Sequence, residues 1–444
     1  MNEVAAARSM GAASGVAAGA PPGGLQVMWR NKRVLTASLV GTSVEFYDFY
    51  IYATAASLVF GPLFFPASSP SVQLIAAYAS FAVAFFARPL GAAVFGHYGD
   101  RIGRKSTLVA SLMLMGGSTL AIAFLPTYES IGWWAPLLLC LMRFGQGFGL
   151  GGEWGGAALL AVENAPPGWR ARFGMFPQLG APVGFLLANG LFLILGETLS
   201  DGEFMAWGWR LPFLASAVLV ILGLWIRLKL TETSEFAEMI EHEEAARLPL
   251  VEVLRHHLTP AIAGTFATVA CYAIFYITTA FALGYGTVNL GMEREGFLLL
   301  QLGAILFMAL GIILAGWWAD RRTPRLVLVA GCLATVPMGI FFGPLLGTGA
   351  SLPIYAALAT GLFVMGFVYG PLGAWLPSLF PTRLRYSGVS FSFNLGGILG
   401  GALAPIVAQS LVSLYGVGTA GLYMSAAAAI SLIALGIAGN RHSH

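Results

Sequence analysis

Long hydrophobic runs follow one another from residue 34 onward and are separated by short polar connections. A helix needs about 20 apolar residues to cross a bilayer, and each run provides roughly that length. We therefore predict an all-α membrane protein with twelve membrane-spanning helices. Their expected ranges are 34–60, 72–97, 106–126, 133–160, 173–197, 209–228, 259–288, 294–318, 326–347, 353–376, 386–414 and 418–438.

Positive charge marks every second connection. One set of connections carries Lys and Arg, among them Lys32, Arg104, Lys105, Arg170 and Arg321, whereas the other set is nearly bare of both and holds acids. Loops rich in Lys and Arg remain in the cytoplasm. We therefore expect both termini to be cytoplasmic.

Composition agrees with a surface that faces lipid. Of the 444 residues, 57% are hydrophobic and 10% are charged, whereas a soluble domain carries roughly 25% charged residues. The three cysteines, Cys140, Cys271 and Cys332, all lie within apolar runs, so we expect them to pack in the interior and to form no disulfide framework.

The longest connection divides the predicted spans into six and six. It is rich in Glu and is interpreted as a solvated linker, with one or two short surface helices as the alternative. We expect a disordered cytoplasmic tail at 1–28, a six-helix bundle at 29–229, the cytoplasmic linker at 230–258 and a second six-helix bundle at 259–444.

Two sequence patterns recur in matching connections of the two halves. The segment 96–105 (GHYGDRIGRK) and the segment 316–325 (GWWADRRTPR) share Gly, Asp, Arg and a terminal base in one register. A second pair of positions, Glu163 with Arg170, matches Ser378 with Arg385 at the same spacing. Internal repeats of this kind are typical of secondary transporters.

These repeats resemble the signature of the major facilitator superfamily. Within it, the chain is similar to the metabolite:proton symporter group, the relatives of proline/betaine, shikimate and 2-oxoglutarate permeases. The resembling segments are 44–50 (VEFYDFY), 86–91 (FARPLG), 143–147 (RFGQG), 151–154 (GGEW), 209–213 (WRLPF) and 379–386 (LFPTRLRY).

The resemblance implies a fold and a mode of action. It implies two pseudo-symmetric six-helix bundles, alternating access and uptake driven by protons, in the cell membrane, here a bacterial inner membrane. The second half departs from the signature, because Thr323 and Pro324 replace Gly and Arg and Ser378 replaces an acid. Because of this departure, the sequence does not predict whether the second half forms the cytoplasmic latch that the resemblance implies.

Three charged residues in the spans are candidates for proton coupling. A charge at mid-bilayer costs at least about 2.5 kcal/mol, so each needs a partner, a wet cavity or a function. Glu45 and Asp48 lie in span one, and Arg143 lies at a similar depth in span four. A carboxylate facing an arginine across a cavity can exchange a proton, whereas the arginine cannot. The alternative is a buried ion pair of Glu45 with Arg143 that only holds the two spans together.

A second group of charges is expected at the cytoplasmic face. There, opposite charges can close the inner gate and separate when it opens, a role that the resemblance supports. The alternative is a set of topology signals, snorkelling side chains and surface salt bridges. The candidates are Arg88, Gly96, Asp100, Arg101, Gly103, Arg104, Glu153, Glu163, Arg170, Asp320, Arg321 and Arg385.

Polar and aromatic groups inside the spans are candidates for substrate binding. Arg143 could bind a substrate carboxylate through its planar fork, and the second half supplies uncharged groups. The alternative is that each of these side chains joins two helices by a hydrogen bond. The candidates are Tyr52, Arg143, Gln146, Tyr272, Tyr276, Gln301, Tyr369, Trp375 and Asn394.

We therefore predict a secondary active transporter that is not an enzyme. It would take up a small organic acid or a zwitterionic metabolite with protons, as a monomer in the lipid bilayer. Its driving force would be the proton gradient, with no cofactor, no metal and no nucleic-acid partner. The alternatives are an efflux antiporter or a uniporter on the same fold and, from another class, a membrane enzyme or sensor, for which no nucleophile–His–acid group or metal cluster is visible in the spans.

Overall fold

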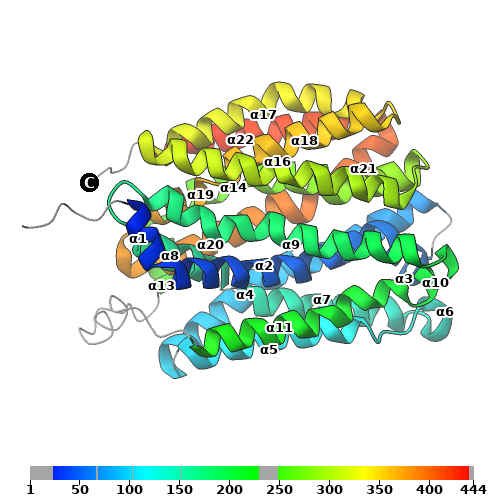
Figure 1. Ribbon diagram of the computed structural model, residues 1–444, viewed down its shortest axis with the longest axis horizontal. Coiled ribbons are helices and arrows are strands. Elements are labelled where there is room, and N and C mark those ends of the chain that lie inside the picture. The colour runs from blue at the N-terminus through cyan, green and yellow to red at the C-terminus, as the bar shows by residue number, and fades with distance from the viewer. Residues whose placement is uncertain (1–23, 67–68, 103, 152, 230–248, 440–444) are drawn as a thin grey trace, which may run out of the picture.

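The computed structural model describes residues 24–66, 69–102, 104–151, 153–229 and 249–439. All regular elements in this part of the chain are helices, and they run side by side along one axis (Figure 1). The expected tail up to residue 23 and the linker residues 230–248 lie outside the described residues. The last residues of the expected tail belong to a short helix, α1.

The first half is built from the following elements in chain order. They are α1 (Gly24–Arg30), α2 (Lys32–Ala55), the π-helix η1 (Ala56–Phe60), α3 (Gly61–Phe64), α4 (Pro70–Ile102), α5 (Arg104–Ile122), α6 (Tyr128–Ile131), α7 (Trp134–Leu150), α8 (Glu153–Glu163), α9 (Arg170–Thr198), α10 (Asp201–Ala206), the 3-10 helix η2 (Gly208–Arg210) and α11 (Leu211–Lys229).

The second half follows the same scheme. It comprises α13 (Pro249–His256), α14 (Leu258–Tyr276), η3 (Ile277–Phe281), α15 (Ala282–Gly284), η4 (Tyr285–Asn289), α16 (Arg294–Arg321), α17 (Pro324–Leu346), α18 (Ser351–Tyr369), α19 (Leu372–Ser378), the 3-10 helix η5 (Thr382–Leu384), α20 (Arg385–Gly397), η6 (Ile398–Ala402), α21 (Leu403–Tyr415) and α22 (Gly418–Ala438). The elements η3, η4 and η6 are π-helical.

The predicted spans correspond to these helices. Within the described residues, nine helical stretches are long and apolar enough to cross a membrane. The three remaining predicted spans correspond to α2, to α5 and to α7 followed by α8. The chain thus has the twelve-helix, all-α architecture that the hydrophobic runs predict.

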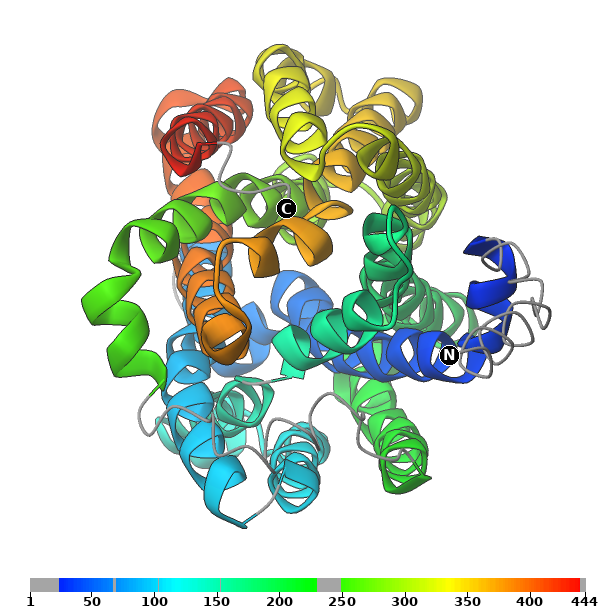
Figure 2. The same ribbon diagram turned by 90° about the vertical axis from the view of Figure 1, so that its left-hand side faces the viewer.

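The two halves meet along two seams. Viewed along the helices, the first half lies mainly in the lower part of Figure 2 and the second half mainly in the upper part. Helix α9 of the first half packs along α16 of the second, and α4 packs along η6 and α21. The short helix α13 lies within the expected linker and packs against α14 and α20 of the second half.

The outside of the bundle is apolar. Large hydrophobic side chains that face outward include Leu141, Ile221, Leu299, Phe341 and Ile433. Exposed Trp29 and Trp317 lie toward the end that carries the termini, and exposed Trp133 and Tyr415 lie toward the other end. Such aromatic belts are typical of the two membrane interfaces.

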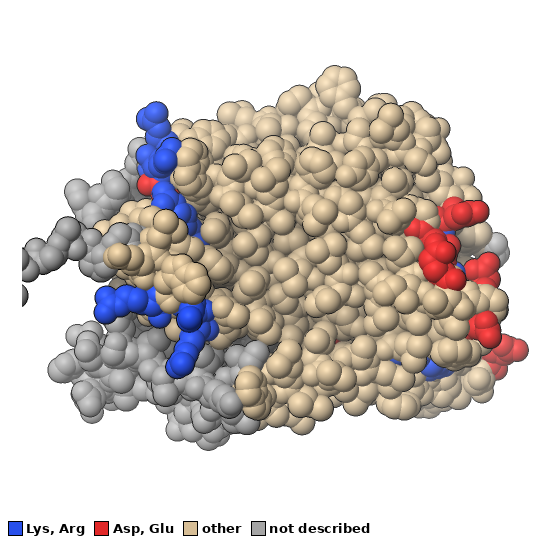
Figure 3. Space-filling model, viewed as in Figure 1, with Lys and Arg blue, Asp and Glu red and all other residues tan. Residues whose placement is uncertain are grey.

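Charge separates the two ends of the bundle. We call the end with α1 and the end of α22 the terminal end, and the end with α3, α6 and α10 the far end (Figure 1). Figure 3 shows basic side chains at the terminal end and mainly acidic ones at the far end. The exposed far-end acids are Glu129, Glu197, Asp201, Glu203 and Glu293.

Glycines bring α4 and α7 into backbone contact. A Cβ at Gly91 would clash with the backbone of Phe148, and a Cβ at Gly147 would clash with the backbone of Ala84. Small residues allow this close approach between membrane helices. The approach matters for function because both helices also border the central cavity described below.

We expect Gly91→Ala and Gly147→Ala to destabilise the protein. Each added methyl group overpacks a backbone contact, which costs about 1–3 kcal/mol. The matched control is Gly190→Ala in α9, where an added Cβ meets nothing within 4 Å. Thermal unfolding in detergent measures the difference, and an equal melting temperature for all three variants would contradict the close approach.

Candidate functional site

A cavity lies between the two halves at the middle of the bundle. It offers about 50 Å³ to the centres of water molecules, and one water needs roughly 10–15 Å³. The cavity therefore holds a few waters, and a small solute would require some side chains to move. Its wall consists of Glu45, Phe46, Phe49, Tyr50, Arg88, Leu150, Gly151, Ala181, Cys271, Tyr272, Phe275, Tyr276, Met365, Tyr369, Ser390, Phe393 and Asn394.

Glu45 and Arg88 are the charged residues among the described residues of this wall. Glu45 comes from α2 and Arg88 from α4, and each side chain is largely buried. The Arg88 guanidinium lies over the rings of Phe49 and Phe85, at 4.4 and 4.8 Å from their centroids. Its Nε has no hydrogen-bond partner among the described residues. Arg88 was expected at the cytoplasmic gate, but the packing of α4 turns it into the cavity.

Arg143 is enclosed by the first half and does not line the cavity. Its side chain is 0% exposed. Its Nε donates to the Phe81 carbonyl at 3.3 Å, and Nη1 donates to Gln146 Oε1. The guanidinium lies 4.1–4.7 Å from the ring centroids of Phe49, Tyr52 and Phe81. The expectation that Arg143 faces Glu45 across a cavity is wrong, because aromatic rings and Gln146 surround it.

Asp48 points away from the cavity as well. Ser216 of α11 donates its hydroxyl to Asp48 Oδ1. Gln146 Nε2 donates to the Asp48 carbonyl at 3.0 Å and to Thr119 Oγ1 at 2.9 Å. Asp48 and Arg143 are therefore joined through Gln146 in one polar network inside the first half. Glu45 and Asp48 were expected to act together, but Glu45 faces the cavity and Asp48 lies in this network.

Four of the expected substrate-binding residues line the cavity. They are Tyr272, Tyr276, Tyr369 and Asn394, all from the second half. Asn394 donates to the Gly151 carbonyl of the first half at 2.7 Å. These uncharged side chains of the second half therefore form part of the cavity wall.

The other expected substrate-binding residues lie elsewhere. Tyr52 and Gln146 belong to the surroundings of Arg143, where Tyr52 donates to Ser80 at 2.8 Å. Trp375 is buried in α19, outside the cavity wall. Gln301 donates to the carbonyls of Thr278 and Thr279, where the π-helical turn η3 leaves backbone groups to be satisfied. These polar groups join helices and do not face the cavity.

Several wall residues were not expected from the sequence. Phe46, Phe49 and Tyr50 come from α2, and Phe275 and Phe393 come from the second half. The aromatic cluster of segment 44–50 was visible in the sequence. However, helical periodicity alone did not indicate which of its rings face the partner half. Ser390 gave no signal, because an isolated serine in a span usually bonds its own helix.

Contacts between the halves lie on the terminal side of the cavity. Asp320 of α16 accepts the backbone N–H groups of Ala171 and Arg172 at 2.8 and 3.0 Å and pairs with the Arg172 guanidinium at 3.2 Å. Arg385 approaches Glu163 at 3.7 Å. The expected gate residues Asp320, Glu163 and Arg385 thus join the two halves.

The remaining gate candidates divide into two groups. Arg321 lies over the Trp317 ring, 3.5 Å from its centroid, and Arg170 is exposed at the start of α9. The other candidates have side chains that lie outside the described part of the structure, so their expected gating role stays a prediction. They are Gly96, Asp100, Arg101, Gly103, Arg104 and Glu153.

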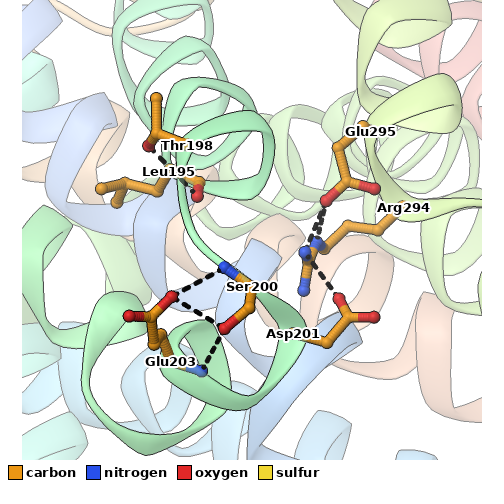
Figure 4. Close-up of polar contacts among 7 residues, drawn as sticks. All are labelled: Leu195, Thr198, Ser200, Asp201, Glu203, Arg294 and Glu295. Atoms are coloured by element: carbon orange, nitrogen blue, oxygen red, sulfur yellow. Dashed lines mark hydrogen bonds and ion pairs between the residues drawn. The ribbon is translucent and has the colours of Figure 1, made fainter.

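Contacts between the halves also lie on the far side. Ser57 and Tyr78 of the first half donate to the Ala280 carbonyl in η3 at 3.0 and 2.8 Å. Further out, Arg294 of α16 bonds Asp201 of α10 at 3.1 Å, and its guanidinium covers the Phe204 ring. Figure 4 shows Arg294 between Asp201 and Glu295.

On the first-half side of this far-end contact, helix α10 begins with a capping box. Ser200 and Glu203 form a capping box at the start of α10, drawn in Figure 4. The bonds from the Ser200 hydroxyl and backbone N–H lower the pKa of the Glu203 carboxyl below its ordinary value. Because the pKa of Glu203 is lower in the folded state, its ionised carboxylate stabilises the fold. This stabilisation is present above the ordinary carboxyl pKa and is lost as the pH falls through the lowered pKa.

Metal ligands do not cluster in the described part of the chain. No group of three or more His, Cys, Asp or Glu residues there could hold a metal ion. Among the described residues, the cavity wall carries one carboxylate, one guanidinium, hydroxyl groups, the thiol of Cys271, the amide of Asn394 and aromatic rings.

Known proteins resemble the chain over most of its length. Residues 34–258 match the family described as "Sugar (and other) transporter". The inner membrane metabolite transport protein YhjE of Escherichia coli is 50% identical over 411 residues, 91% of this chain and 93% of that protein. The shikimate transporter of Escherichia coli is 38% identical over 399 residues, 89% of this chain and 91% of that protein.

A solved structure shares the fold. The major facilitator superfamily proton:xylose symporter XylE, bound to 6-bromo-6-deoxy-D-glucose, aligns with a TM-score of 0.72 over 91% of this chain and 94% of its own. Its sequence identity of 16% limits this likeness to the fold.

We expect the two arginines to respond differently to replacement by lysine. Arg143→Lys removes the bonds to Phe81 and Gln146 inside the bundle and should lower stability by about 2 kcal/mol. Arg88→Lys removes no hydrogen bond found among the described residues and should lower stability far less. Thermal unfolding of the detergent-solubilised protein compares the two, and equal losses would contradict the different environments.

Proposed function

Because this chain belongs to the sugar (and other) transporter family of the major facilitator superfamily, we propose that it takes up a small organic acid or zwitterionic metabolite together with protons, by alternating access. The chain is a multi-pass membrane transporter. The observation that carries the proposal is that Glu45 and Arg88 face one cavity between the two halves. The names of the relatives, a metabolite transporter and a shikimate transporter, support a small organic acid as substrate.

Glu45 is the proton carrier in this proposal. It is the carboxylate of the cavity wall, whereas Asp48 and Arg143 are held in the network around Gln146. A largely buried carboxylate is protonated more readily when the cavity dries, and water entry from either side can remove the proton again. The narrower assignment replaces the expectation that Glu45, Asp48 and Arg143 share the coupling.

Alternating access would use the contacts on both sides of the cavity. In this structure, contacts between the halves are formed on both sides of the cavity. Opening to one side requires one set to separate while the other holds. The excess of Lys and Arg at the terminal end supports its placement in the cytoplasm of a bacterial cell, with the far end facing outward.

The organisation of the chain follows from the same mechanism. We retain the division into a first bundle at 29–229, a linker at 230–258 and a second bundle at 259–444, because the halves must move relative to each other. The two halves of the chain line the cavity between them, which supports transport by a monomer.

Glu45→Gln should abolish proton-driven accumulation. With the carrier neutral at all pH values, an inward proton gradient can no longer concentrate substrate. The measurement is uptake of labelled shikimate into proteoliposomes with and without a gradient, and with an uncoupler. Glu129→Gln, an exposed acid at the far end, is the control. Gradient-driven accumulation by Glu45→Gln would disprove the assignment, and accumulation only in vesicles acidified inside would favour an antiporter.

The gate contacts predict a change in the accessibility of Cys271. This thiol lines the cavity, so its labelling by a membrane-impermeant maleimide reports opening. In a background of Cys140→Ser and Cys332→Ala, Arg294→Gln should speed labelling from the far end, and Asp320→Asn should speed labelling from the terminal end. The exposed Arg294–Asp201 ion pair supports roughly a two- to fivefold effect, and the buried Asp320, which also accepts two backbone N–H groups, should have at least that effect. Faster labelling from the wrong side would contradict the gate assignment.

A further inference from the structure

Three buried polar groups of the cavity wall lack a hydrogen-bond partner among the described residues. They are Nε of Arg88, the hydroxyl of Tyr272 and the hydroxyl of Ser390, from side chains that are 7%, 7% and 5% exposed. A buried polar atom without a partner costs about 1–3 kcal/mol. Such groups persist where a ligand or water satisfies them, and all three lie on the wall of one cavity.

The three groups line the same cavity and are linked through shared neighbouring rings. The Arg88 guanidinium and the Tyr272 ring both contact Phe85, at 4.8 and 6.1 Å between centres. The Tyr272 ring also packs on Phe393, 5.0 Å between centroids, and Phe393 follows Ser390 by one helical turn. The cluster therefore spans the seam, with Arg88 on the first half and the two hydroxyls on the second.

The chemistry of the cluster selects an acceptor. Guanidinium can only donate hydrogen bonds, and phenol and serine hydroxyls donate readily to a charged acceptor. A carboxylate offers two oxygens with about four acceptor sites, and bonds to it from a charged donor are the strong ones. A neutral sugar offers only uncharged acceptors, whose hydrogen bonds to the Arg88 guanidinium are weaker than those of a carboxylate.

Charge balance then links the ligand to Glu45. An ionised Glu45 balances Arg88 within the wall, and a second anion would leave an uncompensated charge in a low-dielectric site. Protonation of Glu45 by a proton from solution removes that excess, so one anion and one proton enter together. The other titratable groups of the wall are the phenols of Tyr50, Tyr272, Tyr276 and Tyr369 and the thiol of Cys271. Helix α8 packs on α2 and begins with a further acid, Glu153, whose side chain lies outside the described part of the structure.

We propose that Arg88, Tyr272 and Ser390 bind the carboxylate of a compact, singly charged organic acid, and that this anion binds together with one proton on Glu45. The inference rests on the proposed function and narrows its substrate class to monoanions. The aromatic wall of Phe46, Phe49, Tyr50, Phe275 and Tyr276 suits a ring or short hydrocarbon body. A ligand held from both halves also favours their closure around it.

Binding to the purified full-length protein tests the donor cluster. The probes are shikimate, benzoate and lactate as monoanions, 2-oxoglutarate as a dianion, glycine betaine as a zwitterion and xylose as a neutral solute. We expect at least one monoanion to bind. Its affinity should fall roughly tenfold to hundredfold in Arg88→Gln and about fivefold in Tyr272→Phe and Ser390→Ala. Arg322→Gln, Tyr355→Phe and Ser392→Ala lie outside the cavity wall and are the matched controls.

Proton uptake tests the link to Glu45. In weakly buffered solution, monoanion binding should remove one proton per site from the medium, and Glu45→Gln should bind the same anion without proton uptake. Three results would overturn the proposal: none of the monoanions binds, Arg88→Gln binds with unchanged affinity, or xylose or 2-oxoglutarate binds more tightly than every monoanion. Tight binding of glycine betaine without proton uptake would assign the cavity to zwitterions instead.

Different results would refute the proposed symport and the proposed carboxylate site. Gradient-driven uptake in proteoliposomes with unchanged affinity in Arg88→Gln would retain the symport and refute the carboxylate site. Carboxylate binding that depends on Arg88, without gradient-driven uptake, would retain the site and refute the symport. Melting temperatures of the variants close to that of the parent protein show that lost affinity does not reflect unfolding.

Discussion

Burying an ionised side chain between helices surrounded by lipid costs several kcal/mol unless protein groups or water replace its hydration. The protein meets this constraint in two ways. Arg143 is enclosed by aromatic rings, a carbonyl and Gln146 within the first half and does not line the cavity. Arg88 is stacked on two rings but opens to the cavity, so its hydrogen-bonding capacity remains available for a ligand.

The contacts between the halves at the terminal end apply the same principle at a helix start. Asp320 accepts two backbone N–H groups at the beginning of α9, where the first amides of a helix have no partner within the helix. The acid of the second-half repeat therefore caps a helix of the first half. The motif 316–325, which departs from the signature at Thr323 and Pro324, still makes this contact because Asp320 is retained.

Much of the architecture was predictable because lipid imposes strong constraints on a sequence. The hydrophobic runs predicted the membrane-spanning helices. The shared motif predicted that the two halves follow one plan. The aromatic second-half wall was also predictable in part, since Tyr272, Tyr276, Tyr369 and Asn394 do line the cavity.

The sequence by itself determined that the chain spans a membrane, how many helices it forms and which charged residues lie within them. Only the tertiary structure decided which of those charges meet. Glu45 and Asp48 are one turn apart, yet one faces the cavity and the other faces Ser216. Periodicity fixes the angle between side chains on a helix, whereas their surroundings depend on how neighbouring helices are rotated and packed. The same packing placed Arg88, and not Arg143, beside Glu45 on the cavity wall.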